Sequence, residues 1–258
     1  MNDPKLMDIR KRIYVIDIYD IDNRGDGKNI KLWGIERPYL REFLKFCMFN
    51  ARNIIVWTAG IRPYAEKIVK HIFRGIGYPS IIYSREHCVN IGSTDNPQYT
   101  KPISKLINSN YNKIHKTINM NNTIIIDDRI DYIQPNFSNA IVIPPYNPVP
   151  TIDSIRNTDI ALLKIMTWFN NPSIRNSIDI KSSKKDNIFM INPSDIVCVY
   201  SIDETNNIND IDNNTTLTDN SEIREKIFTN LLIDPIITPD IEILNINNNL
   251  YKTSITVP

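Results

Sequence analysis

The sequence predicts an α/β domain in which helices cover both faces of a mostly parallel β-sheet. Short apolar runs rich in β-branched residues alternate along the chain with segments whose apolar residues recur at helical spacing. This alternation is typical of βαβ units, whose strands run parallel. Three of the apolar runs also end at polar residues that could take part in chemistry, and open α/β sheets bind ligands at the carboxyl ends of their strands.

The first strand and the first helix are expected near the N-terminus. Residues 13–16, Ile-Tyr-Val-Ile, form an unbroken apolar run that predicts a buried strand, and Asp17 follows at once. After a polar stretch, residues 37–46 carry apolar side chains at helical spacing, and Pro38 is tolerated at a helix start. Asp17, at the end of this strand, is the first candidate for chemistry.

The next elements repeat this order. Residues 53–57, Asn-Ile-Ile-Val-Trp, predict a strand that stops at Thr58, the second candidate for chemistry. Residues 62–74 predict a helix with His71 on its apolar face, where we expect a core residue. A short third strand is expected at residues 80–83.

The strongest strand signal is Thr-Ile-Ile-Ile at residues 123–126, which is ended by the acidic pair Asp127 and Asp128. Residues 140–143 predict the following strand, which two prolines close. The remaining helices are expected at residues 103–107 and 159–169.

The character of the sequence changes near residue 178. We therefore expect one domain over residues 1–177 and a partly disordered extension, rich in Asn and Asp, over residues 178–258. Within the extension we expect strands at 188–191 and 196–200, disorder over 203–222, and a helix or docking segment at 227–237.

Composition narrows the class of protein. The 258 residues include 30 basic and 29 acidic side chains, and a net charge of +1 argues against direct nucleic-acid binding. Three widely spaced cysteines predict neither a disulfide framework nor a zinc site, and Cys88 is interpreted as a packing residue. With no signal peptide and no apolar run near about 18 residues, we expect an intracellular protein, cytoplasmic or nuclear, that does not bind membranes. Heavy use of isoleucine and asparagine is typical of AT-rich genomes, such as those of viruses or parasites.

Several segments occur in a family-specific order over roughly residues 10–170. They are Ile13–Asp17, Arg37–Leu44, Trp57–Gly60, Tyr64-Ala65, Arg85–Cys88, Tyr99–Lys101, Ile124–Asp128 and Asn139–Ile143. This set resembles the RNA polymerase II C-terminal-domain phosphatases, the NLI-interacting-factor-like family of the haloacid dehalogenase superfamily. The resemblance implies a three-layer Rossmann-like fold and a Mg²⁺-dependent phosphatase.

The resemblance also assigns roles to the candidate residues. Asp17 matches the nucleophile that attacks phosphorus to form an aspartyl-phosphate, the alternative being a strand-end capping residue. Thr58 matches the hydroxyl that hydrogen-bonds a phosphoryl oxygen, the alternative being an N-cap for the following helix. Lys101 matches the lysine that neutralises nucleophile and phosphate, the alternative being a solvated loop lysine. Pro102 stands where the family often has an acidic residue.

Asp127 and Asp128 match the acidic position that holds Mg²⁺ in the family, and with Asp17 they are the expected metal ligands. Mg²⁺ prefers oxygen ligands and keeps several waters, so one or two carboxylates are enough. Asp127 is the better direct ligand, while Asp128 either supports the metal indirectly or pairs with Lys101.

The chain departs from the family pattern at the general acid. The family has a second Asp two residues after the nucleophile and a Thr two residues further, where this chain has Tyr19 and Ile21. Tyrosine, with a pKa near 10, is a poor base near neutrality. A one-residue shift would give Asp20 the acid/base role, whereas a shifted motif of Asp20 and Asp22 would leave Asp17 structural. We favour Asp17, because the apolar run ends there.

Two functions follow from the sequence. The first is a Mg²⁺-dependent protein serine/threonine phosphatase, with Asp17 as nucleophile and Asp20 as acid/base, whose substrate is a phosphorylated protein such as the polymerase tail repeat. The second, motivated by Tyr19 and Ile21, is a catalytically impaired relative that binds a phosphorylated partner. Carbon–halogen hydrolysis fits the Asp-x-Tyr order, but the acidic pair at 127–128 argues against it.

Overall fold

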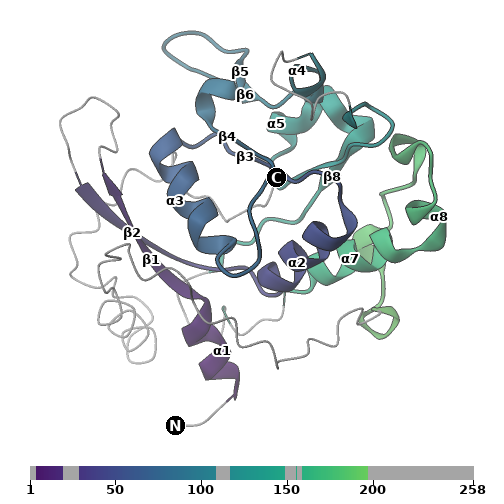
Figure 1. The fold of residues 1–258 in the computed structure, drawn as a ribbon, viewed down its shortest axis with the longest axis horizontal. Coiled ribbons are helices and arrows are strands. Elements are labelled where there is room, and N and C mark those ends of the chain that lie inside the picture. The colour runs from purple at the N-terminus through teal and green to yellow at the C-terminus, as the bar shows by residue number, and fades with distance from the viewer. Residues whose placement is uncertain (1–3, 20–28, 109–116, 149–154, 156–158, 197–258) are drawn as a thin grey trace.

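The computed structural model describes residues 4–19, 29–108, 117–148, 155 and 159–196, without the side chains of residues 4–6 (Figure 1). Asp20, Ile21 and the expected segments at 203–222 and 227–237 lie outside the described residues, as does nearly all of 196–200. The described part contains both helices and strands, which confirms the mixed α/β class.

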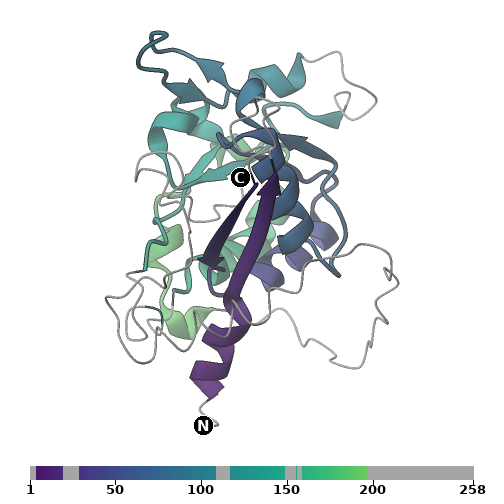
Figure 2. The same ribbon diagram turned by 90° about the vertical axis from the view of Figure 1, so that its left-hand side faces the viewer.

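The strands of the described part form four two-stranded sheets. β3 and β4 pair in parallel, as do β7 and β8, whereas β1–β2 and β5–β6 are antiparallel. The strand bounds are β1 (Ile13–Tyr19), β2 (Asn29–Ile35), β3 (Ile55–Trp57), β4 (Ile81–Tyr83), β5 (Val89–Asn90), β6 (Tyr99–Thr100), β7 (Ile125–Asp127) and β8 (Ala140–Val142). The two parallel pairs lie centrally, while the β1–β2 hairpin lies to one side of them (Figures 1 and 2).

Helices surround the two parallel pairs. The α-helices are α1 (Pro4–Arg12), α2 (Leu40–Asn50), α3 (Arg62–Ile72), α4 (Ile103–Ile107), α5 (Ile130–Ile133), α7 (Ala161–Asn170) and α8 (Pro172–Arg175). The 3-10 helices are η1 (Arg85–His87), η3 (Gln134–Asn139), η4 (Ile180–Ser182), η5 (Ile188–Met190) and η6 (Pro193–Asp195). The helices expected within the described residues are present, but α2 begins at Leu40, after Pro38 and Tyr39 form a turn.

The expectation that the first strand ends at Asp17 was wrong. β1 continues through Asp17 to Tyr19 and pairs along its whole length with β2. Ile16 and Ile18 are buried, while Asp17 is half-buried and Tyr19 is exposed. Beyond Ile16 the chain thus alternates with the period of two that a strand with one buried face requires. The unbroken apolar run marked only the first part of the strand.

The main hydrophobic core connects the hairpin, the parallel strands and three helices. Ile18 of β1, Leu44 of α2, Val69 of α3 and Ile165 of α7 are completely buried in this cluster, together with Ile141 of β8. Burying a large aliphatic side chain contributes about 1.5–3 kcal/mol, so each of these helices is held mainly by its apolar face. The core therefore fixes the positions of β3 and β7, whose carboxyl ends carry the candidate site.

Part of the segment 178–191 packs against this core. Ile188 is 1% exposed within the main cluster. Two hydrogen bonds tie α7 to the same segment, from Trp168 Nε1 to the Lys184 carbonyl at 3.0 Å and from Lys164 Nζ to the Phe189 carbonyl at 2.7 Å. The strand expected at 188–191 is instead the 3-10 helix η5. Apolar residues of this segment pack on α7. This packing explains why the run is apolar although it forms no strand.

The effect of Ile188→Ala measures how far the folded unit extends past residue 177. Because Ile188 is buried and Met190 in the same 3-10 helix is 76% exposed, we expect Ile188→Ala to lower the free energy of unfolding by about 2–5 kcal/mol. Met190→Ala should change it little. Urea denaturation of both variants gives the two free energies of unfolding. An effect of Ile188→Ala as small as that of Met190→Ala would show that this segment does not stabilise the domain.

Within the described ranges, none of the helices combines the length and the apolar character needed to cross a membrane.

Candidate functional site

A buried ion pair between Lys101 and Asp127 forms the centre of the candidate site. Lys101 follows β6, and Asp127 is the last residue of β7. Lys101 Nζ lies 2.5 Å from Asp127 Oδ2, and the two side chains are 5% and 2% exposed. Lys101 is thus not a solvated loop lysine, and Asp127 is its ion-pair partner.

Neighbouring groups hold both members of this pair. The backbone N–H of Arg129 donates to Asp127 Oδ1 at 2.9 Å, so each carboxylate oxygen receives a hydrogen bond. Lys101 Nζ stands 5.1 Å from the centre of the Tyr132 ring, and the Lys101 N–H donates to the Tyr132 carbonyl at 2.7 Å. A buried charge is tolerated when it is paired and hydrogen-bonded, and both conditions are met here.

Asn136, in η3, binds the chain on either side of Pro102. Its Nδ2 donates to the Lys101 carbonyl at 2.6 Å, and its Oδ1 accepts the Ile103 N–H at 2.7 Å. Sequence analysis missed both Asn136 and Tyr132, because no motif or spacing connects residues so far from Lys101 along the chain.

Thr58 lies at the carboxyl end of β3, as expected. Its Oγ1 accepts the Gly60 N–H at 3.0 Å, and its N–H donates to the Tyr83 carbonyl at 2.9 Å. It does not cap the following helix, because Ile61 occupies the N-cap of α3. A hydroxyl that accepts one hydrogen bond still has a hydrogen to donate, so Thr58 can donate to an anion.

The loop after Thr58 needs a glycine at position 60. A Cβ atom on Gly60 would lie 2.8 Å from the Tyr64 ring and 3.2 Å from Thr58 Oγ1. Gly60 thus allows the chain to turn tightly around the Thr58 hydroxyl.

Cys88 lies beside Thr58, at the carboxyl end of β3. Its Sγ lies 3.8 Å from the Thr58 carbonyl, and it is buried. Burial raises the pKa of the Cys88 thiol, while the positive charges of Lys101, Lys105 and Arg85 act to lower the pKa. A neutral thiol in a buried place agrees with the packing role expected for Cys88.

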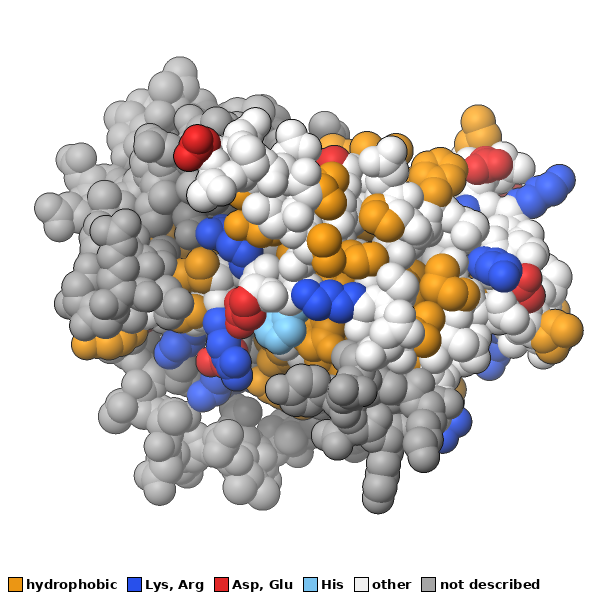
Figure 3. Space-filling view, turned by 90° about the horizontal axis from the view of Figure 1, so that it is seen from above, with side chains coloured by type: hydrophobic (Ala, Val, Ile, Leu, Met, Phe, Trp, Pro, Cys, Tyr) orange, Lys and Arg blue, Asp and Glu red, His pale blue; other side chains and the backbone are white. Residues whose placement is uncertain are grey.

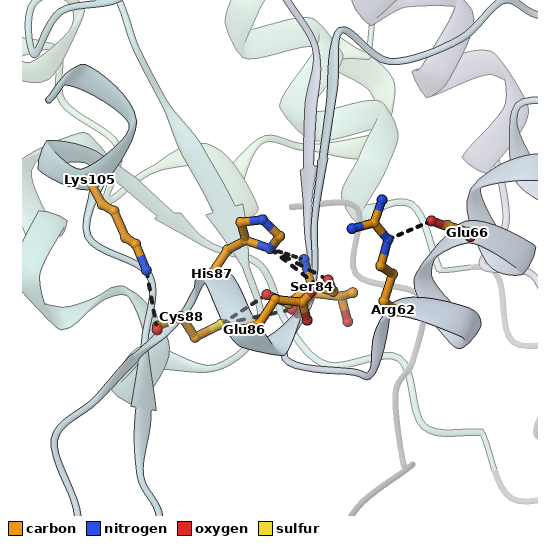
Figure 4. A network of polar contacts seen from close by, with 8 residues as sticks. Arg62, Glu66, Ser84, Glu86, His87, Cys88 and Lys105 are labelled. Atoms are coloured by element: carbon orange, nitrogen blue, oxygen red, sulfur yellow. Dashed lines mark hydrogen bonds and ion pairs between the residues drawn. The ribbon is translucent and has the colours of Figure 1, made fainter. Parts of the chain in front are cut away.

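The segment around Cys88 is fixed by local hydrogen bonds (Figure 4). Lys105 of α4 points toward Cys88 and donates to its carbonyl at 3.5 Å. The His87 ring is turned toward Ser84 and accepts the Ser84 N–H on Nδ1 at 3.2 Å. His87 also stacks on Tyr83, the last residue of β4, at 4.4 Å between ring centres. Local hydrogen bonds therefore hold the segment after β4 in place beside Thr58.

Asp17 lies in the β1–β2 hairpin and contacts a different cation. Its Oδ1 is 2.7 Å from Lys31 Nζ, across the antiparallel pair. Tyr19, at the end of β1, is 66% exposed. The described residues include no group of three or more His, Cys, Asp or Glu side chains arranged to hold a metal ion. The structure thus joins Lys101 to Asp127 and Asp17 to Lys31.

Two ion pairs lie outside the site. His71, on α3, pairs with Glu36 through Nε2 and Oε1 at 2.8 Å, so it is satisfied as expected, but its side chain is 30% exposed and thus only half-buried. Arg37 forms an ion pair with Asp159 at 2.8 Å that ties the start of α2 to the segment before α7. These pairs support the fold rather than the site.

The face on which β5, β6 and α4 lie carries mixed side chains. Viewed from that side, basic, acidic and hydrophobic side chains are interspersed (Figure 3). This mixture agrees with a chain whose net charge is +1.

The family model of the NLI interacting factor-like phosphatases matches residues 8–181. This stretch includes both strand ends and the Lys101–Asp127 pair. The chain belongs to this phosphatase family. The expectation that the chain belongs to the NLI-interacting-factor-like phosphatases is thereby confirmed. In this NLI interacting factor-like phosphatase, Thr58, Lys101 and Asp127 all lie within the matched residues.

Two solved structures are similar to this NLI interacting factor-like phosphatase. One is the fission yeast RNA polymerase II CTD phosphatase Fcp1 bound to beryllium fluoride, with 19% identity, a TM-score of 0.40, and coverage of 54% of this chain and 33% of that chain. The other is Fcp1, described as an essential RNA polymerase II CTD phosphatase, with 16% identity, a TM-score of 0.39, and coverage of 72% and 52%. This chain therefore spans about a third and about half of their lengths. No curated protein matches the sequence.

Proposed function

We propose that this chain is a Mg²⁺-dependent protein serine/threonine phosphatase that acts through an aspartyl-phosphate on Asp17. Membership of a phosphatase family supports the reaction class. The observation that carries the proposal is the buried Lys101–Asp127 pair at the carboxyl end of β7, and Thr58, at the carboxyl end of β3, adds a hydroxyl that can donate to an anion. Phosphoryl transfer needs this kind of positioned charge more than it needs covalent chemistry from the protein.

The residues of the two strand ends would bind the phosphate. The Thr58 hydroxyl donates to one phosphoryl oxygen, and the Lys101 ammonium neutralises the charge on the phosphate. Lys105 and Arg85 add positive charge around Cys88 and raise the local concentration of an anionic substrate.

The acidic residues at the end of β7 fit Mg²⁺ in their chemistry. Both oxygens of Asp127 already accept hydrogen bonds, but a carboxylate has about four lone-pair sites and can accept further partners. Asp127 and Asp128 would hold the ion through hard oxygen atoms, with Asp17 as the third proposed ligand. When bound, Mg²⁺ supplies charge neutralisation for the phosphate.

Asp17 and Asp20 would carry the covalent steps. A carboxylate oxygen of Asp17 forms a bond to phosphorus while the bond from phosphorus to the serine or threonine oxygen breaks, and Asp20 gives that oxygen a proton. Water then attacks the phosphorus of the aspartyl-phosphate, Asp20 takes its proton, and Asp17 is released with inorganic phosphate. For this reaction the Asp17 carboxylate must leave Lys31 and contact the phosphate. The proposed three-layer Rossmann-like fold would bring β1 alongside β3 and β7.

The proposed substrate is a phosphoserine or phosphothreonine in a protein, with the RNA polymerase II C-terminal repeat as one instance. Family membership supports a phosphorylated protein rather than a nucleic acid or a membrane. An intracellular location, cytoplasmic or nuclear, agrees with such a substrate.

A second candidate function is a catalytically impaired protein that binds a phosphorylated partner. Two observations favour it: Tyr19 occupies the expected acid position and is 66% exposed, and Asp17 is paired with Lys31. In this case Thr58 and Lys101 would still bind phosphate, but no aspartyl-phosphate would form.

Hydrolysis of two substrates with and without Mg²⁺ tests the proposal. We expect Mg²⁺-dependent turnover of an activated aryl phosphate and of a phosphoserine peptide, and loss of both in excess EDTA. Because an activated leaving group needs little protonation, Asp20→Asn should slow peptide hydrolysis by about 10²–10⁴-fold and aryl phosphate hydrolysis much less. Absence of turnover by the wild type with any divalent cation, together with binding of inorganic phosphate, would instead support the binding function.

A further inference from the structure

We infer that Asn136 is a positioning residue, whose carboxamide fixes the Lys101 ammonium for binding of a phosphate group. The inference rests on the proposed function, because it assigns Lys101 to the phosphate. Asn136 contacts the backbone of Lys101 and Ile103, and it would act on the Lys101 ammonium through that backbone.

The carboxamide of Asn136 holds both peptide groups around Pro102. Asn136 is 2% exposed, its Nδ2 donates to the Lys101 carbonyl at 2.6 Å, and its Oδ1 accepts the Ile103 N–H at 2.7 Å. A third bond, from the Lys101 N–H to the Tyr132 carbonyl at 2.7 Å, comes from the segment just before Asn136. Every backbone polar group of Lys101 is therefore bound by residues 132–136.

The local sequence makes this support necessary. Pro102 has no N–H and a restricted φ angle, so it contributes only its carbonyl to the turn. It is also the N-cap of α4, a helix of five residues whose N-cap side chain makes no hydrogen bond. Without Asn136, the Ile103 N–H would be an unsatisfied donor at a helix start, and a buried donor without a partner is costly. Asn136 satisfies this donor and the buried Lys101 carbonyl together.

Fixing the backbone matters because of the length of the lysine side chain. A flexible four-carbon stem places its ammonium accurately only when both of its ends are held. At the far end the ammonium contacts Asp127 Oδ2 at 2.5 Å, and at the near end Asn136 and Tyr132 hold the main chain. When a phosphate competes with Asp127 for the ammonium, only the backbone end remains fixed.

Asn139 is a matched control within the same segment. It is also buried and also makes two hydrogen bonds: its Nδ2 donates to the carbonyls of Met120 at 2.6 Å and Thr123 at 2.8 Å. These carbonyls precede β7, whereas Asp127 ends β7, so Asn139 acts at the opposite end of the strand. Removing either carboxamide costs buried hydrogen bonds, but only Asn136 contacts the Lys101 segment.

The experiment compares Asn136→Ala and Asn139→Ala in the full chain. Binding of inorganic phosphate is measured by calorimetry, kcat and KM are measured with an aryl phosphate in Mg²⁺, and thermal unfolding is followed by circular dichroism. We expect both variants to unfold at lower temperature. Only Asn136→Ala should lose phosphate affinity and kcat/KM, by about 10- to 100-fold, because a small misplacement of a catalytic group has effects on the order of 10²-fold.

The outcomes separate this inference from the proposed function. Equal phosphate affinity and kcat/KM in the two variants would overturn the positioning role, even if the wild type is an active phosphatase. A wild type that binds phosphate without turnover would refute the phosphatase, and selective loss of binding in Asn136→Ala would still support the positioning role. A wild type that neither binds nor hydrolyses phosphate would overturn both.

A second pair of variants applies if Asn136→Ala does not fold. Asn136→Asp preserves side-chain size and the acceptor for Ile103 N–H, but its carboxylate cannot donate to the Lys101 carbonyl. Asn139→Asp introduces the same charge three residues away. A larger loss of phosphate affinity in Asn136→Asp than in Asn139→Asp supports the inference, and equal losses contradict it.

Discussion

Asp17→Asn is expected to abolish Mg²⁺-dependent hydrolysis of an aryl phosphate, lowering kcat by on the order of 10⁴-fold or more. An amide cannot form the acyl-phosphate bond, whereas the phosphate-binding residues Thr58 and Lys101 are unchanged. Binding of inorganic phosphate should therefore be retained. Initial rates with an aryl phosphate, together with calorimetry of phosphate binding, measure the two properties separately.

Asp131→Asn is the matched control for this substitution. Asp131 is also a carboxylate paired with a basic side chain, Arg129, but its side chain is 55% exposed. We expect its variant to keep near-normal turnover. If Asp17→Asn retains turnover while the purified wild type depends on Mg²⁺, the nucleophile must be another residue, and the shifted motif of Asp20 and Asp22 becomes the first alternative.

Asp127→Asn is expected to lower the free energy of unfolding by about 3–5 kcal/mol, because it leaves the Lys101 ammonium buried without a counter-charge. The Asn side chain can still accept the Arg129 N–H, so the loss is assigned to the ion pair rather than to the turn. Urea denaturation followed by circular dichroism gives the free energy. The same variant should also lose Mg²⁺-dependent turnover, since Asp127 is a proposed metal ligand.

Two further variants show whether the loss of stability in Asp127→Asn comes from the broken buried ion pair. Replacing both partners, with Lys101→Met and Asp127→Leu together, should recover most of the stability, because a buried ion pair often contributes little more than apolar residues of similar volume. Glu66→Gln breaks the pair of Glu66 with Arg62, whose side chains are 53% and 69% exposed, and should change stability little. A similarly small effect of Asp127→Asn would show that the pair is not buried in solution.

Local patterns in the sequence predicted much of the secondary structure. Helix α3 and strand β3 were found because helical spacing and short apolar runs are properties of neighbouring residues. Tertiary packing decided the exceptions. The run at 188–191 became η5 because it covers α7, and β1 continued through Asp17 because β2 pairs with the whole of it.

The candidate site shows the same division. The chemistry of Thr58 and Asp127 was visible because each stands where an apolar run ends, and the family resemblance drew attention to Lys101. The partners of these residues were not visible, because Asp127 lies 26 positions from Lys101 and Asn136 lies 35 positions from it. A hydrogen bond across such a separation leaves no periodic signal in the sequence.

The sequence by itself determined the phosphatase family, the mixed α/β class and the two strand ends that carry Thr58 and Asp127. Only the tertiary structure decided that Lys101 pairs with Asp127 in a buried place, and that Asn136 holds the backbone of Lys101. The physical reason is that strand ends and helix faces follow from local spacing, whereas the partner of a buried charge depends on which distant segments the core brings together.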